Sequence, residues 1–325
     1  TLVRRIHGRS WPIALTSAPR LPLEIEFEQE ASGQPVTRLA LPEGAYVATA
    51  ADTVRSAEGG LELVETTSWR TPLGVVGIYR VFRGGEVDVH GPSESDGMAE
   101  VISRIGEISG GLVLVDGGWE RRAFAAPGTV DGTVLVVGSS YSASPERSSA
   151  AARYVVETLT VPQCEEAARN AWEETASSGA AVLLDARGRQ VGVLPPGLDD
   201  PTRALESPGR APVTTVVLPH GLNDDFMIPL VRSNFRCALV ARDATRLNVA
   251  PIYFKAWLKG GGKFQVVRPM KLVAVATNPV NHAGPDADPA RFRALVAAAL
   301  PALPAHDIVL ESGDEHRKPV WKFWE

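Results

Sequence analysis

The chain has 325 residues, of which 44% are hydrophobic and 22% are charged, so it can bury a sizeable core in one large or two medium domains. With 33 Lys and Arg against 38 Asp and Glu, its formal net charge is −5. This balance argues against a general nucleic-acid binder, which carries a basic patch. The two cysteines are far apart in the sequence and form no CxxC pair, which excludes a disulfide framework and disfavours a zinc module.

Targeting signals are also absent from the sequence pattern. No apolar run approaches the length of a membrane span. The N-terminal stretch "TLVRRIHGRSWPIALTSAPR" is basic but lacks the continuous apolar segment of a signal peptide. We therefore expect a cytoplasmic protein with reduced thiols and no association with membranes.

The first half of the chain is predicted to form mainly strands. Short β-branched runs bounded by turn residues are typical of buried strands, and they lie at residues 13–16, 46–49, 75–81, 112–115, 133–137 and 155–159. The exception is residues 98–108, where apolar side chains recur at the spacing of an amphipathic helix.

The second half alternates predicted helices and strands. Helices are expected at residues 164–177, 224–233, 252–259 and 289–300, and strands at 181–184, 214–218, 238–240 and 272–276. This alternation predicts an α/β fold with mostly parallel sheets and flanking helices. We expect two interlocked lobes, with an N-terminal lobe at residues 1–162 and a C-terminal lobe at 163–325.

The residues that directly follow the predicted strands are unusually polar. In open α/β sheets, ligands bind beyond the carboxyl ends of the strands. These positions hold Ser17, Asp116, Ser139, His220, Asp243 and Asn278. We expect Asp116, His220, Asp243 and Asn278 to gather at one edge of a sheet and form a single cleft.

Asp116 follows the apolar run "LVLV" and resembles the acid of a Walker B strand, which holds magnesium through water in phosphate-loop enzymes. The partner motif GxxxxGK[ST] is missing, because "SAPRLP" follows the first strand and has neither the glycines nor the lysine. Nucleotide hydrolysis by this chain alone is therefore disfavoured. The alternative is that Asp116 caps a turn or pairs with Arg121.

The segment "HGLNDDF" lies between a predicted strand and a predicted helix. Asn223 or Asp224 can cap that helix. His220, Asp224 and Asp225 could instead ligate a divalent ion. Capping is favoured, because a helix N-terminus attracts anions rather than metals, and we assign no metal site.

Three further strand ends offer polar side chains. In "VARDATR", Asp243 and Arg246 are predicted to form a structural pair. In "ATNPVNH", Asn278 begins a sharp turn, and His282 is either a base or a solvated loop residue. Ser139 follows Gly138, but the GxSxG elbow of a hydrolase is missing. We keep Asp116, Arg121, Ser139, His220, Asp224, Asp243, Arg246 and Asn278 as ligand-binding candidates and assign no catalytic residue.

Several segments together resemble a known family. In order they are "LPEGAYVATAAD", "LELVETTSWRTPLGVVGIYRV", "VDVHGPSES", "LVLVDGGWERRAFAAP", "TVLVVGSS", "VVLPHGLNDDFMIPLV", "LVARDATRLNV" and "KLVAVATNPVN". The series resembles the reactivase accessory subunits of cobalamin-dependent lysine 5,6-aminomutase and ornithine aminomutase, over about residues 40–310. The chain departs from the family at "GGW", "GSS" and "SAPRLP", where the family pattern has Gly-Ala or a glycine-bearing loop.

The resemblance implies an accessory protein that helps to free damaged cobalamin from an aminomutase. In such systems a separate MutS-like subunit performs ATP hydrolysis, which agrees with the missing phosphate loop. The implied partners are the aminomutase and that ATPase, with no nucleic acid or membrane, and a homodimer is left open. No cofactor is expected on this chain itself, and cobalamin is reached only through the mutase. The alternative is a small-molecule or nucleotide-binding α/β enzyme that uses the cleft around Asp116 and His220.

Overall fold

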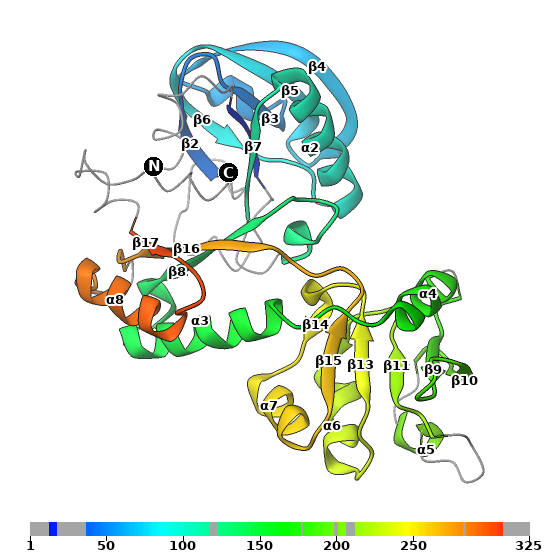
Figure 1. The fold of residues 1–325 in the computed structure, drawn as a ribbon. Coiled ribbons are helices and arrows are strands. Elements are labelled where there is room, and N and C mark those ends of the chain that lie inside the picture. The colour runs from blue at the N-terminus through cyan, green and yellow to red at the C-terminus, as the bar shows by residue number, and fades with distance from the viewer. Residues whose placement is uncertain are drawn as a thin grey trace.

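The computed structural model describes residues 13–17, 37–117, 122–142, 144–176, 178–197, 201–205, 212–281 and 284–307. These residues form an α/β protein built around three principal sheets, with helices packed on them (Figure 1). None of the helices in this part of the chain combines the length and the apolar composition needed to cross a membrane.

The first sheet, which we call sheet A, lies at the top of Figure 1. Its strand order is β4 (Gly60–Thr71), β5 (Gly74–Arg83), β3 (Tyr46–Ala50), β1 (Ile13–Ser17) and β7 (Leu112–Asp116). Strand β1 runs parallel to both β3 and β7, whereas β5 is antiparallel to β3 and β4. The carboxyl ends of β1, β3 and β7 therefore meet at the same edge.

Side chains alternate across sheet A, as the pleat requires. On one face Ala14, Ala48 and Ile78 pack against Val101 and Ile105 of helix α2 (Ser95–Ser109). On the other face, Leu15, Val47, Tyr79 and Val81 pack against residues of an antiparallel ribbon formed by β2 (Thr37–Leu41) and β6 (Gly85–Val89).

The second sheet, sheet E, has the strand order β10 (Gln190–Leu194), β9 (Ala181–Leu184), β11 (Thr215–Val217), β13 (Ala238–Ala241) and β15 (Lys263–Val266). Strands β11, β13 and β15 are parallel, and β9 is antiparallel to both of its neighbours. Helices α6 (Asp224–Arg232) and α7 (Pro251–Lys259) cover one face, and α4 (Glu166–Thr175) packs on the other. A short helix, α5 (Pro201–Leu205), contacts α6.

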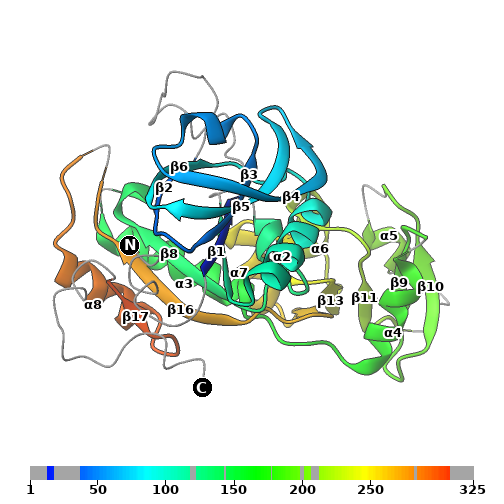
Figure 2. The same cartoon turned by 90° about the horizontal axis from the view of Figure 1, so that it is seen from above.

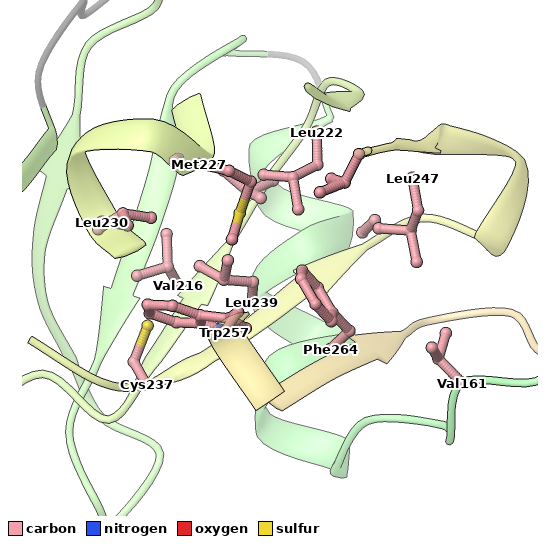
Figure 3. Packing of buried hydrophobic residues seen from close by; sticks show 14 of the residues in the cluster. Val161, Val216, Leu222, Met227, Leu230, Cys237, Leu239, Leu247, Trp257 and Phe264 are labelled. Atoms are coloured by element: carbon pink, nitrogen blue, oxygen red, sulfur yellow. The ribbon is translucent and has the colours of Figure 1, made fainter. Parts of the chain in front are cut away.

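The core between sheet E and helices α6 and α7 contains the largest buried side chains (Figure 3). Trp257 is fully buried, and the rings of Phe254 and Phe264 stack with centroids 4.6 Å apart. Beside them lie Met227, from α6, and Leu239, from β13. A short parallel pair, β12 (Leu222–Asn223) with β14 (Leu247–Asn248), continues the chain beyond the ends of β11 and β13.

The third sheet, sheet D, joins distant parts of the chain. Its strands are β17 (Ala305–His306), β16 (Leu272–Asn278) and β8 (Thr133–Gly138), and both strand pairs are parallel. Helices α3 (Pro145–Leu159) and α8 (Pro289–Ala299) pack on it through Ala152 and Phe292. Helix α3 then leads toward sheet E. Strands β9 and β10 of that sheet, with helices α4 and α5 beside them, lie far from α8 and β17 (Figure 2).

The α/β fold class is confirmed, with parallel pairs in each of the three sheets. Sheets A and E also contain antiparallel pairs. The division near residue 163 stays a prediction, and β8 pairs with β16 across that point. The strand predicted at residues 155–159 is wrong, because these residues end helix α3. That helix begins at a strong start signal, with Ser144 as its N-cap and Pro145 in its first turn.

Candidate functional site

The ligand-binding candidates follow strands of three different sheets. Asp116 ends β7 in sheet A, Ser139 and Asn278 lie at the ends of β8 and β16 in sheet D, and four others lie in the segments that follow β11 and β13 of sheet E. These four are His220, Asp224, Asp243 and Arg246. The expectation that Asp116, His220, Asp243 and Asn278 share one sheet edge is therefore wrong. Apolar strands of similar sequence do not reveal which of them pair with one another.

At the edge of sheet A, Asp116 lies beside Ser17, its register partner across β1 and β7. The Ser17 hydroxyl donates to Oδ2 of Asp116 at 3.4 Å. Ser17 is fully buried, whereas Asp116 is exposed. Its predicted partner Arg121 lies outside the described residues. This edge thus presents a solvent-accessible carboxylate held over a buried hydroxyl.

His90 lies near the same edge and was missed by the sequence reasoning. It follows β6 and is 4% exposed. Its backbone N–H donates to Oγ1 of Thr49 at 2.9 Å, and the next N–H, from Gly91, donates to the carbonyl of Ser17 at 2.9 Å. The signal that could have found it is "VDVHGPS", in which a strand ends on a histidine before a Gly-Pro turn.

A buried polar network supports this edge of sheet A. Asp88 accepts hydrogen bonds from Nε and Nη2 of Arg38 at 2.8 and 3.2 Å and from the Ser56 hydroxyl at 3.0 Å. Thr49 Oγ1 contacts Oγ1 of Thr53 at 2.8 Å and lies 3.1 Å from the carbonyl of Asp88. The Asp88 carboxylate is thus occupied by internal donors, so we assign it a structural role.

In sheet D, Ser139 and Asn278 lie close together because β8 and β16 end side by side, with Asn278 opposite Gly138. The buried Ser139 hydroxyl donates to the carbonyl of Pro279 at 2.6 Å. Oδ1 of Asn278 accepts from the N–H of Val280 at 3.1 Å, as expected for a side chain that begins a turn. Both groups stabilise the loop after β16. His282 lies outside the described residues.

Asp243 in sheet E is fully buried and folds its own loop. Its Oδ1 accepts from the backbone N–H of Thr245 at 3.0 Å and also from the Thr245 hydroxyl. Its Oδ2 accepts from Nε of Arg242 at 2.6 Å. The predicted ion pair with Arg246 is wrong, because Arg242 is the partner and the Arg246 side chain is exposed.

The segment "HGLNDDF" acts mainly as a helix start. Asn223 caps α6 by accepting from the N–H of Phe226 at 3.1 Å, which confirms the capping interpretation. Asp224 Oδ1 accepts from the N–H of Ala250 at 2.7 Å, and Nε2 of His220 lies 3.2 Å from the carbonyl of Gly179. Within the described ranges, no group of three or more His, Cys, Asp or Glu residues is arranged to hold a metal ion.

The loops that follow β7 and β13 meet at the junction of the sheets. The turn η3 (Arg122–Ala125), which follows Asp116, contacts the turn η5 (Ala244–Arg246), and η5 contacts α3. In α3, the Tyr154 hydroxyl donates to the carbonyl of Val249. Burial raises the pKa of Tyr154, and nearby Arg122 partly opposes this shift. The loops after β7 of sheet A and β13 of sheet E thus contact each other through these turns, although their strands lie in different sheets.

A pocket of about 400 Å³ lies at this junction. Its walls are the β7–β8 connection, the α3–α4 connection, α4 and the segment after β15. The lining residues are Pro127, Gly128, Gln163, Arg169, Trp172, Glu173, Val267, Arg268 and Pro269. Apart from Pro127, which ends the segment "LVLVDGGWERRAFAAP", none of these residues belongs to a motif selected from the sequence. The strand-end rule could have pointed to Arg268, but β15 itself was not predicted.

No protein-family model, curated protein or solved structure matches the chain.

Proposed function

We propose that this chain is an accessory factor that reactivates a cobalamin-dependent amino-acid aminomutase and acts with a separate MutS-like ATPase subunit. The observation that carries the proposal is where the family-like segments lie. "LVLVD", "TVLVVG" and "LVAVATN" are β7, β8 and β16, while "VVLPHGLNDD" and "LVARDATR" run from β11 into α6 and from β13 into η5. The resemblance is thus concentrated in strands and the loops that follow them, which is where α/β proteins place their working residues.

The chemistry of these strand ends favours a binding role over catalysis. The side chains of Asp243, Asn278, Ser139 and Asp224 are each engaged in hydrogen bonds that shape a loop or a turn. Such side chains give loops a defined shape and can thereby present a rigid surface to a partner protein. Asp116 differs in that its carboxylate is exposed to solvent, although it also accepts a hydrogen bond from the Ser17 hydroxyl.

The sequence after β1 supports the division of labour with a separate ATPase. Prolines at positions 19 and 22 occupy the place where a phosphate loop needs donor N–H groups, and proline has none. In the proposal, the MutS-like subunit supplies the energy of ATP hydrolysis, and this chain contacts the mutase. Cobalamin remains a ligand of the mutase.

A reactivation assay tests the proposal. A lysine or ornithine aminomutase is inactivated by turnover and then incubated with ATP, adenosylcobalamin, the ATPase subunit and this chain. Activity should return only when both proteins are present. Equal recovery without this chain would refute the accessory role.

ATP turnover by the isolated chain separates the proposal from its alternative, a small-molecule or nucleotide-binding enzyme that uses the exposed Asp116 carboxylate. The accessory role predicts no turnover. A rate on the order of 1 per second, which lies in the usual enzymatic range, and its loss in Asp116→Ala would favour the alternative. Light scattering on the same sample measures whether the chain is a homodimer.

A further inference from the structure

The pocket at the junction of the sheets combines two arginines with an aromatic ring. Arg169, Trp172 and Glu173 come from α4, at spacings of three and four residues that place them on one face of the helix. Arg268 comes from the segment after β15, at the carboxyl end of the parallel strands of sheet E. The pocket therefore occupies the place where open α/β sheets bind ligands.

Neither guanidinium group has a counter-ion among the residues that the structure describes. In the described part of the chain, neither the Arg169 nor the Arg268 side chain forms an ion pair or a hydrogen bond with another residue. Glu173 lies four residues after Arg169, a spacing that suits an ion pair, and yet the two side chains are not paired. Two free arginines beside one carboxylate leave the pocket with a net positive charge.

The remaining walls hold Arg268 in place and supply further polar groups. The backbone N–H of Arg268 donates to the carbonyl of Arg242 at 2.8 Å. Gly128 has a φ of +98°, and a Cβ there would lie 3.4 Å from Nη1 of Arg268. Nε2 of Gln163 donates to the carbonyl of Val267 at 3.1 Å, which fixes the amide while leaving its Oε1 as an acceptor.

Trp172 adds an unsatisfied donor. Its Nε1 is shielded from solvent and has no hydrogen-bond partner among the described residues. Buried indole N–H groups normally find an acceptor, so an orphaned one needs an explanation, such as a ligand that supplies the acceptor. Trp172 therefore provides both a ring for stacking and a donor beside the two arginines.

We propose that this pocket binds a phosphorylated small molecule that carries a planar ring. Arginine recognises phosphate through paired N–H donors, and Arg169 and Arg268 supply two such groups. The indole of Trp172 packs against the ring, while Gln163 and Glu173 accept hydrogen bonds from its N–H or O–H groups. A volume of about 400 Å³ suits such a ligand and lies within the common range for small-molecule sites, roughly 300–1,000 Å³. The proposed binding in this pocket requires neither a mutase partner nor nucleotide hydrolysis.

Calorimetry with three probes tests the proposal on the full chain: AMP, adenosine and inorganic phosphate. We expect AMP to bind, and adenosine to bind at least about tenfold more weakly, because it lacks the charge that the arginines recognise; tenfold corresponds to about 1.4 kcal/mol. Arg169→Gln and Arg268→Gln should each weaken AMP binding about tenfold, since a hydrogen bond to a charged group contributes about 1.5–3 kcal/mol. The double variant should weaken it further.

Arg83→Gln is the matched control, because Arg83 is an exposed arginine at the end of β5 in sheet A and does not line the pocket. It should bind AMP like the unmodified chain. Thermal unfolding of each variant verifies that the fold is kept. Trp172→Phe retains an aromatic ring but loses the N–H, and it should weaken AMP binding severalfold.

Three results would overturn the proposal. The first is that neither AMP nor inorganic phosphate binds at concentrations up to about 10 mM, which would detect even a weak site. The second is that AMP binds with equal affinity to the folded Arg169→Gln/Arg268→Gln double variant, which would place the binding elsewhere on the chain. Binding of adenosine as tightly as AMP would refute the role assigned to the phosphate.

Discussion

Sheets A and E each place an aspartate at the carboxyl end of a parallel strand, Asp116 at the end of β7 and Asp243 just beyond β13, and the two aspartates have opposite environments. Asp116, after "LVLV", is exposed and accepts from the Ser17 hydroxyl at 3.4 Å. Asp243, which follows "ALVAR", is fully buried and is bonded to Arg242 and Thr245. The same sequence pattern therefore yields one carboxylate that can meet a ligand and one that stabilises its own loop.

The two sheets also differ in how they are held together. Sheet E packs large rings, with Trp257, Phe254 and Phe264 among its buried residues. Sheet A buries smaller side chains on its helix face, such as Ala14 and Ala48, and adds a polar network around Asp88. The first arrangement depends on shape complementarity, and the second also depends on every polar group keeping its partner.

The largest effect is expected from removing the central ring of the sheet E core. Trp257→Ala should lower the free energy of unfolding by about 3–5 kcal/mol, because it leaves a large cavity in a close-packed core. Ile252→Ala is the control on the same helix, since Ile252 is 69% exposed, and it should change stability by about 0.5 kcal/mol or less. Denaturant unfolding measures both. Similar midpoints for the two variants would mean that Trp257 is not packed as described.

Substituting each of the two aspartates tests directly whether their environments differ. Asp243→Ala should destabilise the protein by about 3 kcal/mol, because it leaves buried donors of Thr245 and the Arg242 charge without their acceptor. Asp116→Ala should cost only about 0.5 kcal/mol or less, because the carboxylate is exposed. Equal losses of stability in the two variants would contradict the difference in environment.

A smaller loss is expected in the polar network of sheet A. Asp88→Asn keeps the shape of the side chain but removes the charge that receives two hydrogen bonds from Arg38. Charge-assisted hydrogen bonds contribute about 1.5–3 kcal/mol, so we expect a loss of about 2 kcal/mol. Chemical denaturation measures the free energy of unfolding of Asp88→Asn and of a control, Glu86→Gln. Glu86 is an exposed residue on the same strand, β6. If Asp88→Asn loses no more stability than the control, the polar network around Asp88 contributes little to the stability of the protein.

Asp185, at the β9–β10 turn, should give sheet E a mild sensitivity to acid. The backbone N–H of Arg189 and its guanidinium, with the N–H of Arg187, hold the pKa of this carboxyl below its ordinary value. Its stabilising contribution is then present above the unfolded pKa of about 3.9 and is lost as the pH falls through the lower folded pKa. Asp185→Asn should therefore lower the Tm near neutral pH, with the difference shrinking below about pH 4. A constant difference in Tm across this range would contradict the shift.

The smallest effect concerns the reactivity of a thiol in sheet E. Burial raises the pKa of Cys237, which precedes β13 and packs in the core. Because the thiolate is the reactive form, iodoacetamide should alkylate Cys237 far more slowly in the native protein than in denaturant. Mass spectrometry of the labelled peptide measures both rates. Equal rates would mean that the core opens readily around this residue.

Much of the local structure could be predicted from the sequence. The strands around residues 112–116 and 133–138 and the helix at residues 95–109 were found, because buried runs and helical periodicity are local signals. The strand prediction at residues 155–159 is wrong, because a short β-branched segment fits either a strand or a buried helix turn. The local signal that favours the helix is its start at Ser144 and Pro145. Strand β4 was missed because its mixed polar residues lack a continuous apolar run.

The candidate site was predictable only in part. The capping role at Asn223 and the turn at Asn278 follow from local hydrogen-bonding preferences, so the sequence indicated them. The pairing of Asp243 with Arg242 rather than Arg246 depends on which way each side chain points after the strand ends. The pocket around Arg169 and Arg268 joins residues 99 positions apart, and no local pattern links them.

The sequence by itself determined the α/β class, most of the strands and the start of α6, because propensity, periodicity and capping act within a few residues. Only the tertiary structure decided which strands share a sheet, so it alone placed β8 beside β16 and separated Asp116 from Asp243. The physical reason is that strand pairing depends on long-range packing of similar apolar faces, and many pairings satisfy the same local pattern. The environment of each strand-end carboxylate, exposed or buried, followed from that choice.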